Sequence, residues 1–345
     1  MIQKPATIRA IAEAAGVSPS TVFRVMNEPN LVKPSTRAKV QAAQKFLETE
    51  SPKEAGRNAV PTRSVGVIIP MSTAQNIDRH PSLFVIITSF LSEISNANIA
   101  NTMLVFDENT MRGEDLLLRP MNGYLIIGTT EEQESLILPV LSRASLPCVM
   151  INRHADVPYI SSVKLDDRAA CADATRYLIS LGHRRIVFLG GQKNYQHTKR
   201  RLEGYLDAMS EAALPVSEEW IFYGEYSENS GYTMGKMAEG LEIRPTAALC
   251  ASDTIAIGCI HAMQEKGLSV PEDFSVVGFG DIESSRILTP ALTTISQSSV
   301  EEGTIAARVL MQMMNSPLIV RDQLMLQTRM IVRSSTGAPP KTEGQ

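Results

Sequence analysis

The chain has 345 residues, of which 43% are apolar, and a formal net charge of −4 at pH 7. This length and composition predict an ordinary globular protein of two or three domains with a substantial core. No apolar run approaches the ~20 residues of a membrane span and residues 1–25 lack the apolar core of a signal peptide, so we expect a cytoplasmic protein without membrane contact.

Residues 7–27 are typical of two helices joined by a tight turn. Thr7 can cap a first helix whose apolar residues recur at helical spacing, at Ile8, Ile11, Ala12 and Ala15. Gly16 supplies the left-handed conformation that ends a helix, and Ser18 with Pro19 forms an N-cap and first position for the next helix. In a helix-turn-helix, the N-terminal end of the second helix enters the DNA major groove. An ordinary helical hairpin is the alternative.

A third helix is predicted from Pro34, and it completes a small core with Val40, Ala43, Phe46 and Leu47. Residues 1–47 carry seven Lys or Arg against two Glu, a net charge of +5, so the rest of the chain carries −9. A basic head on an acidic body concentrates attraction for phosphate at one end. The charge therefore favours DNA binding over a simple hairpin.

From Ser64 onward, short apolar strands alternate with helical stretches, which predicts parallel sheets built from strand-helix-strand units. The expected strands are Val65–Ile69, Met103–Phe106, Tyr124–Ile127, Val149–Ile151, Ile186–Leu189, Ala248–Cys250 and Val276–Phe279. Their number favours two sheets, with a cleft at the strand ends where the halves meet. Breaks at 152–159 and at Thr289-Pro290 are expected to be the crossings between the halves.

These motifs resemble the LacI/GalR transcriptional regulators. In the head, the resemblance rests on the run Ala-Thr-Ile-(x)₂-Ile-Ala-(x)₂-Ala-Gly-Val-Ser-(x)₂-Thr-Val-x-Arg-Val-x-Asn at Ala6 to Asn27. In the body, it rests on Leu181-Gly182-His183-Arg184-Arg185-Ile186, Arg201-(x)₂-Gly204-Tyr205, Ala251 to Gly258 and Val276 to Asp281. The resemblance implies a small all-α helix-turn-helix head joined to an α/β body of two parallel-sheet subdomains, a periplasmic-binding-protein-like type I fold.

The same resemblance implies a domain plan. It places the DNA-binding head at 1–47, a hinge at 48–63, the effector-binding and dimerisation domain at 64–336 and a tail at 337–345. The two subdomains are expected at roughly 64–160 with 290–320, and at 161–289 with 321–336. The polar tail from Ser334 to Gln345 is expected to be disordered.

By resemblance, the function is that of a sequence-specific transcriptional regulator, a repressor of carbohydrate metabolism with no catalytic residues. It implies a homodimer on a pseudo-palindromic operator in double-stranded DNA, with a small sugar, sugar-acid or phosphorylated effector in the cleft. The DNA-contacting positions implied by the family, with Arg57 added from the hinge, are Thr7, Pro19, Ser20, Thr21, Arg24, Asn27, Thr36 and Arg57. The effector-binding positions are Asn152, Arg153, Asp166, Arg201, Tyr226, Ser252 and Gly280.

Three departures from the family pattern bear on function. Phe23 stands where the family usually has a phosphate-binding Ser, and residues 48–63 lack the Leu that wedges into the minor groove. Gly280 stands where many members have an Asp that accepts hydrogen bonds from sugar hydroxyls. Losing that carboxylate while keeping Lys199, Arg200 and Arg201 nearby lowers the cost of burying an anion. The sequence therefore favours an anionic effector, either a gluconate-type sugar acid or a phosphorylated metabolite.

Two other classes of function are weighed against this one. An enzyme is disfavoured because no Gly-x-Gly-x-x-Gly loop follows a strand, and the pair Asp166-Asp167 more often caps a helix. A ligand sensor without a specific DNA target is the main alternative, because the hinge is altered. We expect no metal or cofactor, because the five His lack ligand spacing. The four cysteines are expected to be buried thiols: Cys148, Cys171, Cys250 and Cys259.

Overall fold

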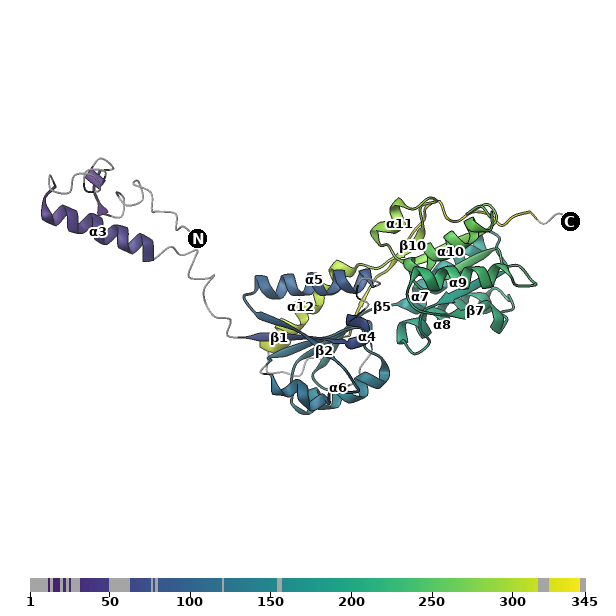
Figure 1. The fold of residues 1–345 in the computed structure, drawn as a ribbon, viewed down its shortest axis with the longest axis horizontal. Coiled ribbons are helices and arrows are strands. Elements are labelled where there is room, and N and C mark those ends of the chain that lie inside the picture. The colour runs from purple at the N-terminus through teal and green to yellow at the C-terminus, as the bar shows by residue number, and fades with distance from the viewer. Residues whose placement is uncertain are drawn as a thin grey trace. The chain divides into compact units, whose positions relative to one another are not determined.

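The computed structural model forms two compact units, Met1–Pro61 and Thr62–Gln345. It describes residues 12, 15–18, 21–22, 25, 32–49, 63–75, 77, 80–119, 121–153, 157–315 and 323–341, and only the backbone of 34 and 44–49. Each unit is treated by itself below (Figure 1).

The described residues of the first unit contain part of the core that the sequence predicts. Gly16 has a φ of +64°, and the Ser18 Oγ accepts a hydrogen bond from the Thr21 N–H at 3.3 Å, so the predicted helix end and N-cap are confirmed. Helix α3 (Pro34–Thr49) begins at the predicted proline. The apolar side chains that pack together are Ala12, Val22, Val25, Val40 and Ala43. The predicted core positions Ile8, Ile11, Phe46 and Leu47 lie outside the described side chains.

The first sheet of the second unit has the strand order β11-β5-β4-β3-β1-β2, and every neighbouring pair is parallel. Its strands are β1 (Ser64–Pro70), β2 (Ala100–Phe106), β3 (Gly123–Ile126), β4 (Cys148–Ile151), β5 (Ile160–Leu165) and β11 (Gln323–Leu326). Helices α5 (Pro81–Asn96) and α12 (Ser299–Asn315) cover one face (Figure 1). Helix α6 (Glu131–Arg143) and the 3₁₀ helix η3 (Gly113–Leu118) cover the other. Both faces are buried, as a parallel sheet requires.

The second sheet has the order β12-β10-β9-β8-β6-β7, and only the β10–β12 pair is antiparallel. Its strands are β6 (Ile186–Gly190), β7 (Ile221–Tyr223), β8 (Ala247–Cys250), β9 (Ser275–Gly280), β10 (Thr293–Ser296) and β12 (Arg329–Ile331). The helices around it are α7 (Asp167–Ser180), α8 (Gln196–Glu211), α9 (Glu228–Glu239), α10 (Asp253–Glu265) and the short α11 (Glu283–Ile287). Helix α7 packs against α8, and α9 against α10. The remaining short elements are α4 (Met71–Ala74) and η4 (Glu218–Trp220).

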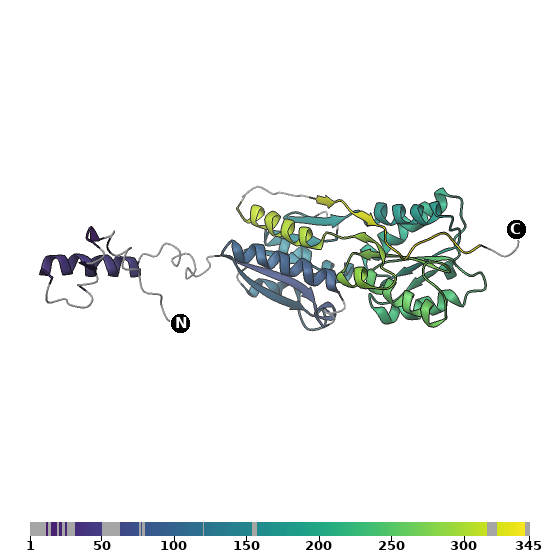
Figure 2. The ribbon, with the colours of Figure 1, turned by 90° about the horizontal axis from the view of Figure 1, so that it is seen from above.

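The chain passes between the two sheets at places that the sequence did not predict. It crosses after β5, after β10 and after β11, so the predicted changes of subdomain near 160, 290 and 320 each come about five residues too early. Segment 152–159 joins β4 to β5 in one sheet, and Thr289-Pro290 lies between α11 and β10, so both predicted crossings are wrong. Proline marks a loop but carries no information about the sheet that follows. The third of these crossings, from β11 in the first sheet to β12 in the second, is the yellow segment in Figure 2.

Part of the expected disordered tail is packed instead. The Ser335 hydroxyl donates to the Val276 carbonyl at 2.6 Å and accepts from the Thr293 N–H at 2.8 Å. His183 lies within 3.0 Å of the Gly337 carbonyl. Backbone polar groups next to a buried sheet edge must be paired, and this segment pairs them. Residues 334–337 are therefore packed on the second subdomain, and 342–345 lie outside the described residues.

All four cysteines are buried free thiols, as predicted. Among the described residues, no helix has both the length and the apolarity to cross a membrane.

Candidate functional site

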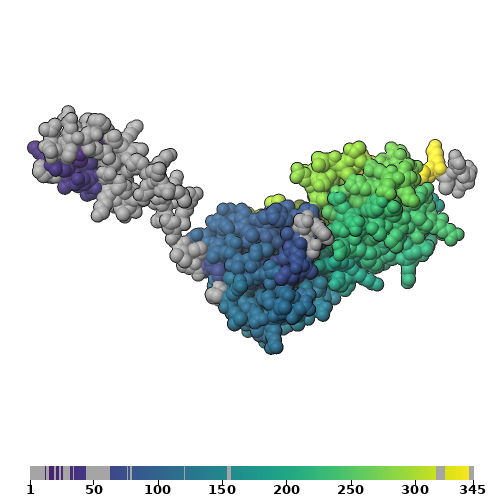
Figure 3. Space-filling view, in the orientation of Figure 1, coloured from purple at the N-terminus to yellow at the C-terminus, as the bar shows by residue number. Residues whose placement is uncertain are grey.

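A cavity of about 120 Å³ lies where the carboxyl ends of the two sheets face each other. The first sheet contributes the segments that follow β3 and β4, including Thr129, Asn152 and Arg153. The second contributes Ser252 and Asp253 after β8 and Phe279 at the end of β9. Open parallel sheets place ligand sites at this edge. In Figure 3 the blue first subdomain and the green second subdomain meet at a notch in the surface.

Arg201 is the central cation of the second subdomain. Its side chain belongs to the inward face of α8 and is 6% exposed. The Nε donates a hydrogen bond to Asp167 Oδ1 at 2.7 Å, and Nη1 donates one to the Ala251 carbonyl. The guanidinium carbon lies 3.5 Å from the centroid of the Phe279 ring. Gly204 allows α8 to approach α7 closely enough for Arg201 to pair with Asp167, because a Cβ at Gly204 would lie 2.0 Å from the Arg168 carbonyl of α7. The guanidinium is thus fixed on three sides.

Arg153 plays the matching part in the first subdomain. It is 5% exposed, and its Nη2 donates to Glu134 Oε2 at 2.7 Å. The Thr129 hydroxyl donates to the other Glu134 oxygen at 2.7 Å, which fixes the carboxylate. The Nη1 of Arg153 is buried with no hydrogen-bond partner among the described residues. A buried donor without a partner is costly, so this atom is available to an acceptor in the cavity.

Four aromatic rings that lie close together form one wall of the cavity: His80, Tyr195, His197 and Tyr226. Tyr226 lies 5.1 Å from the His197 ring centroid and 6.4 Å from those of Tyr195 and His80. Its hydroxyl is 2.7 Å from the Thr198 hydroxyl, and burial raises its pKa to about 12. Burial, and then the nearby Arg201 and Arg153, hold the pKa of His197 well below its usual range. His197 is therefore neutral near pH 7.

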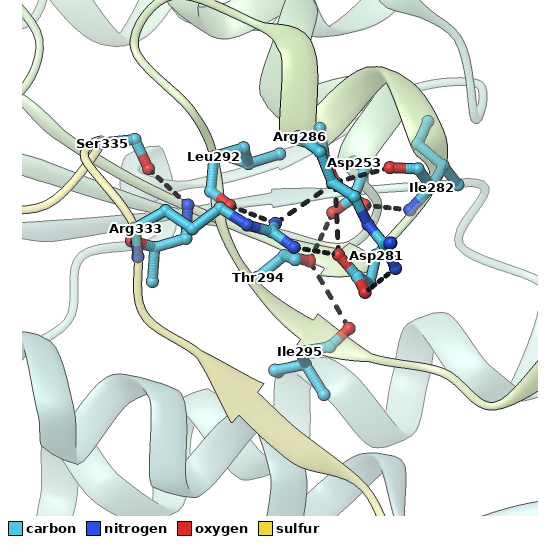
Figure 4. A network of polar contacts seen from close by, with 11 residues as sticks. Asp253, Asp281, Ile282, Arg286, Leu292, Thr294, Ile295, Arg333 and Ser335 are labelled. Atoms are coloured by element: carbon cyan, nitrogen blue, oxygen red, sulfur yellow. Dashed lines mark hydrogen bonds and ion pairs between the residues drawn. The ribbon is translucent and has the colours of Figure 1, made fainter.

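A polar network holds the second-subdomain side of the cavity in place (Figure 4). Asp253 accepts hydrogen bonds from the Ile282 N–H at 2.9 Å and from the Thr294 hydroxyl, and burial raises its pKa to about 6. Asp281 pairs with Arg286 at 2.7 Å and with Arg333. The Arg333 Nη1 also donates to the Leu292 carbonyl at 2.7 Å. The loop after β9 is thereby tied to the packed C-terminal segment.

Comparison with known proteins decides the family. The model "Bacterial regulatory proteins, lacI family" matches residues 7–48, and "Periplasmic binding protein-like domain" matches residues 175–336. The HTH-type transcriptional repressor PurR of Pasteurella multocida is 30% identical over 335 residues, which cover 96% of this chain and 98% of the relative. The chain belongs to the LacI family. It is a DNA-binding transcriptional regulator, and the predicted family and fold class are confirmed.

Other LacI-family proteins extend the match. The probable HTH-type transcriptional repressor ExuR of Bacillus subtilis is 28% identical over 338 residues, covering 95% of this chain and 98% of the relative. The transcriptional regulator CelR–cellobiose complex has a TM-score of 0.72 at 25% identity, covering 96% of this chain and 99% of that one. The lac repressor dimer bound to operator and the anti-inducer ONPF has a TM-score of 0.70 at 26% identity, covering 97% and 100%.

The structure of this LacI-family chain brings five of the seven predicted effector-binding residues to the cavity: Asn152, Arg153, Arg201, Tyr226 and Ser252. Asp166 caps α7 by accepting a hydrogen bond from the Ala169 N–H at 3.1 Å, and it lines an adjoining cavity of about 280 Å³. Gly280 lines another hollow. Lys199 pairs with Glu131 at 3.3 Å and Arg200 with Glu203 at 3.0 Å, so neither adds charge to the main cavity.

The sequence prediction missed several lining residues. His197 lies one helical turn before Arg201 on α8, so the shared face was a usable signal. His80 and Gln297 reach the cavity from segments of the first subdomain and of a crossing, which no local pattern marks. Glu302, in the first turn of α12, does not line the cavity but is fully buried behind Asn152, and no sequence motif marks it. Among the described residues, no group of three potential metal ligands is found.

Of the eight predicted DNA-contacting residues, the structure describes Thr21 and Thr36. The Thr21 hydroxyl is 2.8 Å from the Ser18 Oγ. Thr36 lies in the first turn of α3, and its N–H donates to the Lys33 carbonyl at 3.0 Å. Six lie outside the described residues: Thr7, Pro19, Ser20, Arg24, Asn27 and Arg57. Phe23 and most of the hinge lie outside them as well. These DNA contacts remain predictions.

Proposed function

We propose that this LacI-family protein is a transcriptional repressor that binds a pseudo-palindromic operator as a homodimer. We also propose that a sugar acid in the cleft changes its affinity for DNA, by binding and without catalysis. The relative from Pasteurella multocida carries the name of a transcriptional repressor, and the lac repressor structure is a dimer on its operator. A dimer reads both halves of a palindromic site, which allows one small head to suffice.

The observation that carries the effector class is the pair of buried guanidinium groups. Arg153 and Arg201 approach the cavity from different subdomains, and each has a buried carboxylate, Glu134 or Asp167, on one side. Each side chain is thus neutralised in part, yet donors remain for a ligand: Nη1 of Arg153 is unpaired among the described residues. A charged N–H₂ group of this kind forms a strong, charge-assisted hydrogen bond with a carboxylate oxygen. The aromatic wall suits the apolar face of a sugar chain.

Two experiments test the two halves of this proposal. Selection of duplexes from a random DNA pool, at roughly physiological salt, should enrich a palindrome with a defined half-site. Retention of DNA without sequence preference would instead favour the ligand sensor without a specific target. Calorimetry of the full chain should show binding of D-gluconate or D-glucuronate that is at least about tenfold tighter than that of D-glucose or cellobiose. Tight binding of a neutral sugar and none of either acid would refute the effector class.

A charge-neutral variant sharpens the second test. Arg153→Gln removes the cation and the unpaired Nη1 donor and leaves a shorter, neutral side chain that can still form hydrogen bonds. This variant should lose more affinity for D-gluconate than for D-glucose. Arg143→Gln is the matched control. Arg143 is the last residue of the outer helix α6, its side chain is 74% exposed, and its guanidinium lies 3.8 Å from Glu114. If Arg153→Gln lowers the affinities for D-gluconate and D-glucose equally, Arg153 contributes to the fold and not to anion recognition.

A further inference from the structure

A buried carboxyl group lies directly behind one of the residues that line the cleft. Glu302, in the first turn of α12, is 0% exposed, and its Oε2 accepts a hydrogen bond from Asn152 Nδ2 at 3.1 Å. Its Oε1 is buried and has no hydrogen-bond partner among the described residues. Asn152 follows β4 with a φ of +56° and lines the cavity. The two residues thus join the first-subdomain wall of the cleft to the helix that follows a crossing.

The contact determines which end of the Asn152 amide faces away from Glu302. An ionised carboxylate only accepts hydrogen bonds, so it must face the Nδ2 donor. The Oδ1 acceptor is then the opposite end, and it is buried without a partner among the described residues. A protonated carboxyl can donate to Oδ1 instead, which lets the amide turn round and present its N–H₂ group on the other side. The first arrangement suits a ligand hydroxyl, and the second suits a ligand carboxylate.

The surroundings of Glu302 leave both arrangements within reach. The Gln297 side chain donates to the carboxyl group, and the charged groups that act on it are Asp167 of α7 and Arg201 of α8, with opposite effects. The start of α12 adds the partial positive charge of a helix N-terminus. Burial is the largest influence, and it raises the pKa of Glu302 to about 7. Both protonation states are therefore populated near neutral pH.

We propose that Glu302 is a specificity-determining positioning residue of the cleft: its protonation state sets whether Asn152 offers an acceptor or a donor to the ligand. The proposal rests on the cleft being the effector site, as argued above. The ionised form favours neutral polyhydroxy ligands, and the protonated form favours carboxylates. Uptake of a sugar acid is then accompanied by uptake of a proton at Glu302.

The response of the Asn152 amide to the protonation state of Glu302 can be measured without any ligand. In the full chain labelled with ¹⁵N-asparagine, the side-chain N–H₂ signals of Asn152, identified by their loss in Asn152→Asp, should move between pH 5.5 and 8.5. Glu302→Gln should abolish this movement. Glu301→Gln, which changes the exposed neighbouring carboxylate, should leave it unchanged. The other asparagine signals report whether each variant is folded. Signals that stay fixed, or that still move in Glu302→Gln, would overturn the proposal.

The second experiment measures specificity. The ratio of D-gluconate to D-glucose affinity, measured by calorimetry at pH 6 and pH 8, should change about tenfold in favour of gluconate at the lower pH, as expected for one exchanged hydrogen bond. In Glu302→Gln the ratio should be the same at both pH values. A pH-dependent ratio in that variant would refute the role of Glu302. If neither probe binds, the proposed effector class fails, whereas the amide signals still decide the proposal on Asn152 and Glu302.

Discussion

Arg201→Met should be among the most destabilising single changes in the second subdomain. The substitution keeps much of the apolar length of the side chain but removes the partner of Asp167. Both side chains of this pair are 6% exposed, and the Nε–Oδ1 distance is 2.7 Å. Breaking a buried pair by removing one partner costs about 3–5 kcal/mol, because it leaves an uncompensated charge. Loss of the stacking on Phe279 adds to that cost.

Urea unfolding followed by fluorescence measures this directly. Trp220 is the chain's single tryptophan and is 6% exposed in the core of the second subdomain. Arg176→Met is the matched control, because Arg176 pairs with Glu211 at 2.9 Å while the two side chains are 48% and 56% exposed. Such surface pairs contribute about 1 kcal/mol or less. The difference between the two variants isolates the effect of burial.

A second substitution tests the cause. Adding Asp167→Asn to Arg201→Met removes the stranded charge and should recover at least about 2 kcal/mol. The loss in Arg201→Met alone should also shrink as pH falls, because the carboxyl can then take up a proton. If Arg201→Met unfolds at the same urea concentration as Arg176→Met, or if Asp167→Asn recovers nothing, the reasoning about a buried pair is wrong.

Two further predictions concern stability elsewhere. Gly258→Ala should lower the free energy of unfolding in urea by about 2–3 kcal/mol, because its Cβ would lie 1.9 Å from the Glu228 carbonyl and force α9 away from α10. Gly240→Ala should be nearly neutral, because no atom would lie closer than 3.5 Å to its Cβ. Equal losses of stability in the two variants would contradict the packing argument. Burial lowers the pKa of His183, so the folded state binds its proton less readily than the unfolded chain. The stability that this supplies is present above the unfolded value of 6.5 and is lost as pH falls below it. His183→Gln should flatten the decline in unfolding free energy between pH 6.5 and lower values, and an unchanged slope would show that other groups cause it.

The local elements were predictable because each depends on nearby residues. The Gly16 turn, the Ser18 cap and the start of α3 follow from backbone preferences within a few positions. The seven predicted strands are all present with small changes at their ends. The missed strands are β5, β7, β10, β11 and β12, which are short, carry polar residues or lie at the sheet edges. A strand of three or four residues has too little periodicity to be read from one sequence.

The site was predictable in part, for a related reason. Motif positions gave Arg201, Tyr226 and Ser252 as lining residues because a motif fixes their distance from a strand end. The partners of Arg201 and Arg153 could not be read in the same way, because Asp167 and Glu134 lie 34 and 19 residues from them. Only the packing of α7 on α8, and of the segment after β4 on α6, brings these charges together. Pairing, and not charge count alone, determines what the cleft can bind.

Gly280→Asp tests the sequence argument about the missing carboxylate. Gly280 has a φ of +139°, where any side chain is strained, and its Cβ would lie 3.5 Å from Asp253 Oδ2. Gly280→Ala introduces only the backbone strain, which should lower the free energy of unfolding by about 1–3 kcal/mol. Gly280→Asp also places a carboxylate beside Asp253, and burial already raises the pKa of Asp253 to about 6.

A raised carboxyl pKa gives stability that is present below the unfolded value and is lost as pH rises through the folded value. The aspartate variant should therefore be less stable than the alanine variant at pH 8, and the difference should narrow at pH 5. Gluconate should bind the aspartate variant more weakly than the alanine variant in calorimetry. Because Gly280 does not line the cavity but Asp253 does, such a result would mean that position 280 acts on the ligand through the charge of Asp253. Equal unfolding curves and equal gluconate affinities in the two variants would show that the charge at this position has no bearing on anion binding.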